Sequence, residues 1–189
     1  MEQGTEKPGT MKRGSKPAII VITGAESTGK SVLTRQLSRH FSAPAFMEFA
    51  REYITGLHRP YGYSDVESIA RMQQAQMKAA LNMNQPLVLF DTWMIITMVW
   101  FEVVYGKIPG WIIENIANTP VDLFLVCDTD LPWVPDPVRE NGGEMRDRLE
   151  SRYMQLIREF GFPLRVVSGS GDKRLHSAAH FIASTGYNL

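Results

Sequence analysis

Short apolar runs alternate along this chain with longer stretches in which apolar residues recur at helical spacing. Five of the short runs are candidate strands, and most of them are rich in Val, Ile, Leu and Phe, which is typical of β-strands. They predict strands at residues 18–23, 44–48, 87–91, 121–127 and 164–167. The stretches between them predict helices at residues 30–41, 50–57, 65–84, 92–105, 110–117, 146–160 and 172–184. This alternation is the pattern of an α/β protein.

The predicted strands are largely apolar throughout and do not alternate between apolar and polar residues. Strands of this kind are buried on both faces, so they favour a parallel sheet with helices on both faces and right-handed crossovers. We therefore expect a sheet of about five strands in a single domain. In such a sheet a ligand binds outside the carboxyl ends of the strands, so the residues that follow each strand are the candidates for function.

A glycine-rich loop follows the first predicted strand. Residues 24–31 read GAESTGKS and match G-x-x-x-x-G-K-[ST], the phosphate-binding P-loop of the P-loop NTPase fold. Glycine allows the backbone to approach a phosphate closely, and the start of the next helix provides N–H groups and a positive dipole end. Lys30 adds a charge for the β and γ phosphates, and the Ser31 hydroxyl can bind Mg²⁺. The predicted nucleotide-binding residues in this segment are Gly24, Ala25, Glu26, Ser27, Thr28, Gly29, Lys30, Ser31 and Val32.

Two carboxylates follow the next two predicted strands. Glu48 ends the second predicted strand, which we expect to be an inner strand, and there it could accept the proton of an attacking hydroxyl. Asp91 is the last residue of LVLFD, the third predicted strand. An aspartate in that position of a P-loop protein is typical of support for Mg²⁺, although it also fits a helix N-cap. We predict catalytic roles for Lys30, Glu48 and Asp91, with Ser31 and Asp91 at the metal, and either carboxylate remains open as the base. Trp93 could stack on a flat substrate ring or belong to the core.

The segment after the fourth strand contains prolines, glycines and three arginines. It predicts a lid around residues 133–148, which would close over a bound nucleotide. Arg139 and Arg148 are candidate catalytic residues, and Arg146 is a candidate nucleotide ligand, because the guanidinium group binds phosphate through two hydrogen bonds. For Arg148 the alternative is an ion pair with Glu144 along one helix.

Composition limits the partners of the protein. Basic and acidic residues number 20 each, so the totals show no sign of binding to nucleic acid or to an anionic membrane. Residues 1–17 lack apolar periodicity and predict a disordered tail, followed by one P-loop domain over residues 18–189. No signal peptide or membrane span is predicted, and the single cysteine, Cys127, fits a reducing compartment, so we expect a cytoplasmic protein.

Several motifs together resemble the ribosylnicotinamide kinase domain of the NadR family. They are GAESTGKS, EFAREYI, the helix entry at Tyr63–Asp65, LVLFDT and the segment with Asp130, Pro132, Trp133, Asp136 and Arg139, and they span residues 18 to about 184. The resemblance implies transfer of the ATP γ-phosphate to the 5′-hydroxyl of nicotinamide riboside, with Mg²⁺ as cofactor. It also implies that Glu48 is the candidate base and that Arg139 and Arg148 belong to the lid. Trp93 stands where members of this family commonly carry a second acidic residue.

Other functions of a P-loop protein remain compatible with these residues. The chain could phosphorylate another nucleoside or a small alcohol, act as a nucleotide-hydrolysing switch that binds a protein, or bind nucleotide without catalysis. A homo-oligomer is a further possibility, because four aromatic residues could form an exposed interface if they do not belong to the core. These residues are Trp100, Phe101, Tyr105 and Trp111.

Overall fold

The computed structural model describes residues 16–135 and 142–186, and five parallel strands form one sheet at its centre. The strands lie in the order β2-β3-β1-β4-β5, which confirms the predicted parallel sheet. Their bounds are β1 (Ala18–Thr23), β2 (Ala45–Phe46), β3 (Leu87–Asp91), β4 (Leu123–Cys127) and β5 (Leu164–Val167). The strand that leads into the glycine-rich loop, β1, is therefore the central one.

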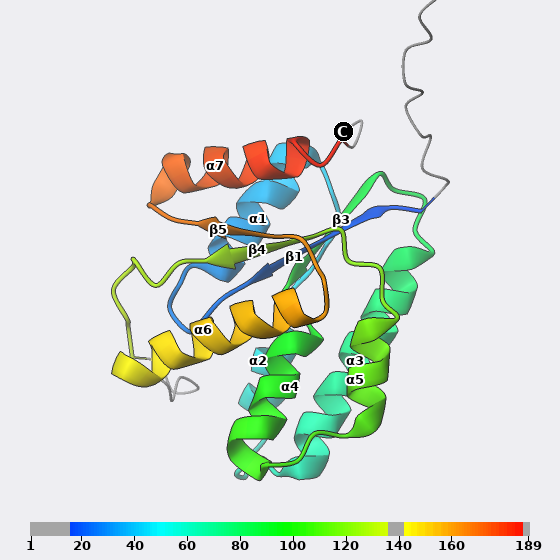
Figure 1. The fold of residues 1–189 in the computed structure, drawn as a ribbon, viewed down its shortest axis with the longest axis vertical. Helices are drawn as coiled ribbons and strands as arrows, with labels where there is room; N and C mark the ends of the chain where they lie inside the picture. The colour runs from blue at the N-terminus through cyan, green and yellow to red at the C-terminus, as the bar shows by residue number, and fades with distance from the viewer. Residues whose placement is uncertain (1–15, 136–141, 187–189) are drawn as a thin grey trace, which may run out of the picture.

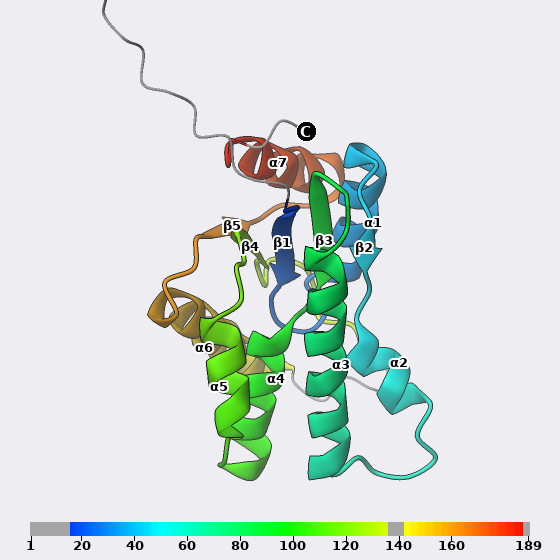
Figure 2. The same ribbon diagram turned by 90° about the vertical axis from the view of Figure 1, so that its right-hand side faces the viewer.

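Helices cover both faces of this sheet, as expected (Figures 1 and 2). Helices α1 and α7 pack on one face, and α3, α4, α5 and α6 lie on the other. The helices are α1 (Lys30–Phe41), α2 (Phe49–Thr55), α3 (Tyr63–Leu81), α4 (Met94–Trp100), η1 (Phe101–Tyr105), α5 (Gly110–Ala117), α6 (Gly143–Glu159) and α7 (Gly171–Ala183), where η1 is a π-helix that continues α4.

Two apolar clusters hold the layers together, one on each face of the sheet. Successive strand residues point to opposite faces. Accordingly, Ile20 and Ile22 of β1 pack with α1 and α7, whereas Ile19 and Val21 pack with the helices of the other face. Every residue of β1, β3 and β4 is buried, which explains why the sequence of these strands is apolar without alternation.

Apart from shifts of one to three residues at the ends of other elements, the structure differs from the sequence prediction in the following respects. The second strand is only Ala45–Phe46 and lies at the edge of the sheet, so the expectation that Glu48 follows an inner strand is wrong. The predicted helix at 92–105 divides into α4 and the π-helix η1. Helix α6 begins at Gly143, three residues before its predicted start, and Phe101 is fully buried and unavailable for an exposed interface. Trp100, Tyr105 and Trp111 are half-buried against the core, and an oligomer remains a prediction.

Candidate functional site

The glycine-rich loop after β1 has the backbone conformation that an anion site requires. Gly24, Ser27 and Gly29 have φ angles of 135°, 57° and 78°, all in the left-handed region. Residues of this kind within a turn let neighbouring backbone N–H groups converge on a concavity that binds anions. A Cβ on Gly24 would lie 2.6 Å from the Cys127 carbonyl oxygen, so only glycine lets this loop lie against the end of β4. Gly29 is the N-cap of α1, whose positive dipole end faces the same loop.

Side chains of the loop brace its own backbone. The Lys30 ammonium and the Thr28 hydroxyl each donate to the Ala25 carbonyl at 2.8 Å. The Ser27 hydroxyl exchanges hydrogen bonds with the backbone of Val134, donating to its carbonyl at 3.2 Å and accepting from its N–H at 3.1 Å. The loop is therefore connected to the segment that follows β4, part of which we predicted as the lid.

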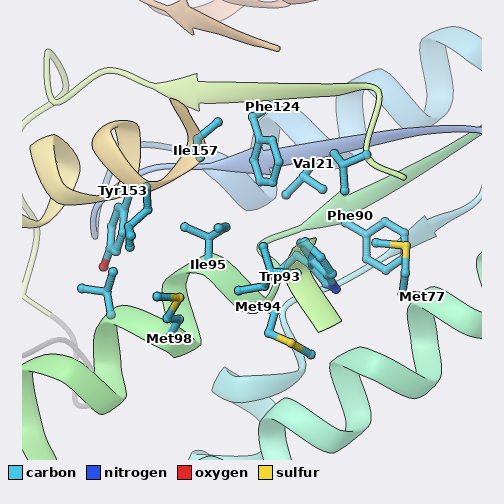
Figure 3. Packing of buried hydrophobic residues seen from close by; sticks show 14 of the residues in the cluster. Val21, Met77, Phe90, Trp93, Met94, Ile95, Met98, Phe124, Tyr153 and Ile157 are labelled. Atoms are coloured by element: carbon cyan, nitrogen blue, oxygen red, sulfur yellow. The ribbon is translucent and has the colours of Figure 1, made fainter. Parts of the chain in front are cut away.

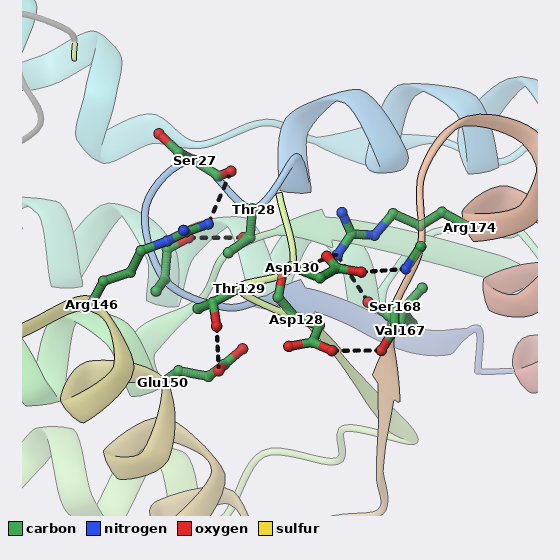
Figure 4. Close-up of polar contacts among 12 residues, drawn as sticks. Ser27, Thr28, Asp128, Thr129, Asp130, Arg146, Glu150, Val167, Ser168 and Arg174 are labelled. Carbon is green, nitrogen blue, oxygen red and sulfur yellow. Dashed lines mark hydrogen bonds and ion pairs between the residues drawn. The ribbon is translucent and has the colours of Figure 1, made fainter. Parts of the chain in front are cut away.

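Arg146 lies against the glycine-rich loop and binds its backbone (Figure 4). Its side chain is buried, with 7% exposed, and donates to the carbonyl oxygens of Glu26 at 2.9 Å and Ser27 at 3.3 Å. The charged guanidinium thus supports the shape of the loop, a role that the sequence did not indicate. Direct binding of Arg146 to a nucleotide stays a prediction.

Of the other two predicted arginines, only Arg148 belongs to the described residues, and its ion-pair partner is not in the loop. Arg148 is 73% exposed and pairs with Glu144 at 3.2 Å, which is the alternative that its helical spacing offered. Its catalytic role stays a prediction, and Arg139 lies outside the described residues. Arg152, one turn further along α6, forms two 2.9 Å hydrogen bonds with Glu102 of η1 and so fixes α6 to that helix.

Asp91 is a buried carboxylate without a hydrogen-bond partner. It is 1% exposed at the end of β3, and neither of its oxygens has a partner among the described residues. Burial raises its pKa from 3.8 to about 6; the nearby Ser31 hydroxyl and Lys30 charge oppose this rise, and the Glu48 carboxylate adds to it. An unpaired carboxylate next to the P-loop serine suits Mg²⁺, which takes one or two protein oxygens and completes its shell with water and phosphate. Within the described residues no cluster of three His, Cys, Asp or Glu side chains forms a separate metal site.

Glu48 directly precedes α2 and lines the main cavity of the described structure. This cavity has a volume of about 550 Å³, and Gly24 and residues 26–32 of the glycine-rich loop form part of its wall, whereas the buried Ala25 does not. Three aromatic side chains from different elements line it as well, namely Tyr61, Trp100 and Tyr153. The ring of Tyr61 meets that of Trp100 edge to face with centroids 4.9 Å apart. Burial raises the pKa of Tyr153, so its hydroxyl remains protonated and able to donate.

The loop that carries Tyr61 is held at the start of α3. The buried Asp65 carboxylate accepts hydrogen bonds from Arg59 at 2.7 and 2.8 Å and from the Gly62 N–H at 2.7 Å. The Tyr53 hydroxyl adds a bond of 3.1 Å from α2. These bonds keep the pKa of Asp65 well below its ordinary value, and the bond from Arg59 has the largest effect. They join α2, the loop and α3 into one wall of the cavity.

Trp93 belongs to the core and does not line the cavity. Of the two roles that the sequence allowed, stacking on a substrate ring and packing in the core, the structure shows the second. It is 1% exposed and packs among apolar side chains that include Met77, Phe90 and Met94 (Figure 3). The residue before it, Thr92, lines the cavity with a φ angle of 65°, a left-handed conformation that is rare for a β-branched residue. Strain of this kind concentrates at functional sites.

Sequence reasoning missed three residues near the site. Gln73 and Thr97 line the cavity and share a buried hydrogen bond. Arg174, 4% exposed at the start of α7, donates to the carbonyl oxygens of Asp128 and Val167 and to the Asp130 carboxylate (Figure 4). It ties the loops after β4 and β5 together beside Gly29. The Ser-Gly-Ser-Gly run before α7, at the carboxyl edge of the sheet, was the signal that could have pointed to this region.

No helix in the described ranges combines the length and apolar character needed to cross a bilayer.

Comparisons with known proteins agree with this geometry. The family model described as AAA domain matches residues 19–174. Two proteins named trifunctional NAD biosynthesis/regulator protein NadR, from Salmonella typhimurium and Escherichia coli, are each 24% identical over 145 residues. The match covers 74% of this chain but only 35% of each of these longer relatives.

Solved structures share the fold. A crystal structure of a NadR protein in complex with NR has a TM-score of 0.72 and 24% identity, covering 92% of this chain and 52% of that one. A deoxyadenosine kinase from M. mycoides with bound products has a TM-score of 0.62 and 15% identity, covering 88% of this chain and 99% of that one. At such identities the similarity establishes a shared fold.

Proposed function

The chain belongs to the family described as AAA domain, and from this premise we propose that it transfers the γ-phosphate of ATP to the 5′-hydroxyl of nicotinamide riboside. The similarity to NadR proteins, one of them solved with NR, supports this acceptor. One observation carries the proposal: the glycine-rich loop and three aromatic side chains line the same cavity, about 550 Å³ in volume. Cavities of about 300 to 1,000 Å³ are typical of small-molecule sites.

The aromatic residues suit the ring of this acceptor. Nicotinamide riboside carries a flat, positively charged pyridinium ring, and the faces of Trp and Tyr attract cations. Trp100, Tyr61 and Tyr153 come from three different elements, and the Asp65 network holds the loop that carries Tyr61. The ring can therefore bind against preformed aromatic surfaces while the ribose lies toward the loop.

The reaction needs an aligned hydroxyl and a charge match for the phosphoryl group. The acceptor oxygen forms a bond to the γ-phosphorus, the bond from that phosphorus to the bridging oxygen of ADP breaks, and the hydroxyl proton passes to a carboxylate. Glu48 is the proposed base because it lines the cavity, whereas Asp91 is buried behind it. Lys30 and the N–H groups of the loop stabilise the charge that spreads over the phosphoryl oxygens.

Mg²⁺ fits the residues present, because within residues 16–135 and 142–186 neither oxygen of Asp91 has a hydrogen-bond partner, and Ser31 lines the cavity beside the phosphate loop. These two residues would hold the ion. When bound, it would neutralise part of the phosphate charge. The burial of Asp91 serves this role, since a carboxylate without hydrogen bonds is a stronger ligand for a cation than a solvated one.

The test combines an assay of ATP consumption with ³¹P NMR of the product. We expect ADP to form only when nicotinamide riboside is present, and the product to carry a 5′-phosphate. Glu48→Gln should lower kcat roughly 100- to 10,000-fold with ATP affinity preserved, the range typical of an acid–base residue. Glu114→Gln is the matched control, because Glu114 is exposed on α5, does not line the cavity and should leave turnover unchanged.

Two results would overturn the assignments. A Glu48→Gln variant with the turnover of the unmodified protein would remove Glu48 as the base. A protein that binds ATP but consumes it at the same rate with and without any riboside in a panel would not be a riboside kinase. Other nucleosides in that panel distinguish a different acceptor from the absence of kinase activity.

A further inference from the structure

Gln73 is a polar residue within the apolar side of α3. Its neighbours one turn away on this helix, Ile69, Ala70 and Met77, are all buried in or beside the core, and Gln73 itself is 4% exposed. Burial of an amide costs free energy unless its polar atoms find partners. A leucine at this position would fill the same space without that cost, so the amide calls for a functional explanation.

Thr97 holds one end of this amide. The Thr97 hydroxyl of α4 donates to Gln73 Oε1 at 2.7 Å, across the buried contact between α3 and α4. A buried hydroxyl proton needs an acceptor, and Gln73 Oε1 is the acceptor that Thr97 has within the described residues. This requirement sets the orientation of the amide, because the flipped form would leave the Thr97 proton without an acceptor.

The orientation leaves the nitrogen end of the amide for a ligand. The bond from Thr97 uses only Oε1, and Gln73 makes no other side-chain hydrogen bond among residues 16–135 and 142–186. Gln73 Nε2 carries two donors. Thr97, which holds the amide, lies three residues before Trp100 on α4, and Gln73, Thr97 and Trp100 all line the cavity, so we place these donors at its aromatic side.

We propose that Gln73 determines acceptor specificity by donating a hydrogen bond to a carbonyl oxygen on the flat ring of the acceptor, with Thr97 as the residue that positions its amide. This inference rests on the proposed function. It adds that the site recognises a substituent on the acceptor ring, such as a carboxamide or carboxylate, as well as the ring itself. A ring without an acceptor oxygen would leave Nε2 buried and unpaired. A site built to form a hydrogen bond discriminates strongly against a ligand that cannot form it.

The experiment compares nicotinamide riboside with the riboside of unsubstituted pyridine, which has the same charge and sugar but no carboxamide. We expect kcat/KM to favour nicotinamide riboside by roughly 10- to 100-fold. Gln73→Met keeps the length of the side chain and should abolish this preference by lowering kcat/KM for nicotinamide riboside alone. Turnover of pyridine riboside and affinity for ATP then report that the variant is folded.

Thr97 is tested through the same pair of ribosides. Thr97→Val removes the hydroxyl with little change in shape, so the amide is free to flip; we expect a several-fold rise in KM for nicotinamide riboside with kcat retained. Thr97→Ser restores the hydroxyl and should recover the preference. Gln76→Leu is the matched control, since Gln76 is a half-buried glutamine of the same helix that does not line the cavity.

Each outcome has a distinct meaning. If the unmodified protein phosphorylates both ribosides equally well, or if Gln73→Met keeps the preference, the role of Gln73 is wrong while the kinase proposal stands. If neither riboside is phosphorylated, the proposed function itself fails. If Thr97→Val behaves as the unmodified protein does, Thr97 only joins two helices.

Discussion

Asp91 offers a quantitative test of the site, because a buried carboxylate makes the folded protein sensitive to pH. A rise in its pKa from 3.8 to about 6 corresponds to about 3 kcal/mol of preference for the protonated form in the folded state. Between these two pKa values the folded protein binds more protons than the unfolded chain, so its stability falls as pH rises through this window. Above about pH 6 the buried, ionised Asp91 carboxylate lowers the unfolding free energy by its full amount, and below pH 3.8, where the carboxyl is protonated in both states, this loss disappears.

The substitution Asp91→Asn removes this titration and keeps the shape of the side chain. Other groups titrate alike in both proteins, so the difference in unfolding free energy isolates Asp91. We expect this difference to shift by about 2 kcal/mol in favour of the asparagine variant between pH 4.5 and pH 8. Phosphotransfer should be lost in the variant, because an amide cannot replace a carboxylate at Mg²⁺.

Urea denaturation of both proteins at a series of pH values, without nucleotide or metal, measures this shift. A repeat at pH 8 with Mg²⁺ and a non-hydrolysable ATP analogue should stabilise the unmodified protein more than the variant, since only the former offers the ion a carboxylate. Two parallel stability curves from pH 4.5 to 8 would refute the reasoning, because Asp91 would then titrate equally in the folded and unfolded chains. Retained phosphotransfer by Asp91→Asn would refute its role at the metal.

Two further substitutions test the support of the glycine-rich loop. Gly24→Ala forces a Cβ to 2.6 Å from the Cys127 carbonyl oxygen, at a residue with a φ angle of 135°. We therefore expect the unfolding free energy, measured by urea denaturation, to fall by about 2 kcal/mol or more and the KM for ATP to rise. Stability and KM equal to those of the unmodified protein would contradict this geometry. Arg146→Gln removes charged donors from the carbonyls of Glu26 and Ser27, which should cost roughly 2 to 4 kcal/mol, whereas Arg148→Gln should change stability by less than about 1 kcal/mol. Equal effects of these two arginine substitutions, measured by thermal denaturation, would show that Arg146 does not support the loop.

Much of the fold was readable from local signals. The three inner strands β1, β3 and β4 stand out because each is a short run rich in Val, Ile, Leu and Phe, and all of their residues are buried. The P-loop followed from eight residues in a row, because the spacing of Gly24, Gly29 and Lys30 is itself the geometry of the phosphate site. The second strand was less predictable, since an edge strand of two residues leaves little pattern.

The assignments that failed or stayed open concern side chains whose roles depend on distant neighbours. Nothing in its local sequence distinguishes Trp93, which is core, from Trp100, which lines the cavity. Arg146 and Arg148 are two positions apart on α6, so they point to different sides of the helix, one into the loop and the other into solvent.

The amino-acid sequence alone therefore indicated the parallel sheet, the phosphate loop and Asp91 at the end of β3, because the pattern that predicts each of them lies in short runs of adjacent residues. The tertiary structure decided the order of the strands, the burial that raises the pKa of Asp91 and the identity of the residues that line the cavity. Gln73 and Thr97 show the reason: they are 24 residues apart and meet only because α3 packs against α4. A pattern read along the chain carries no record of such contacts.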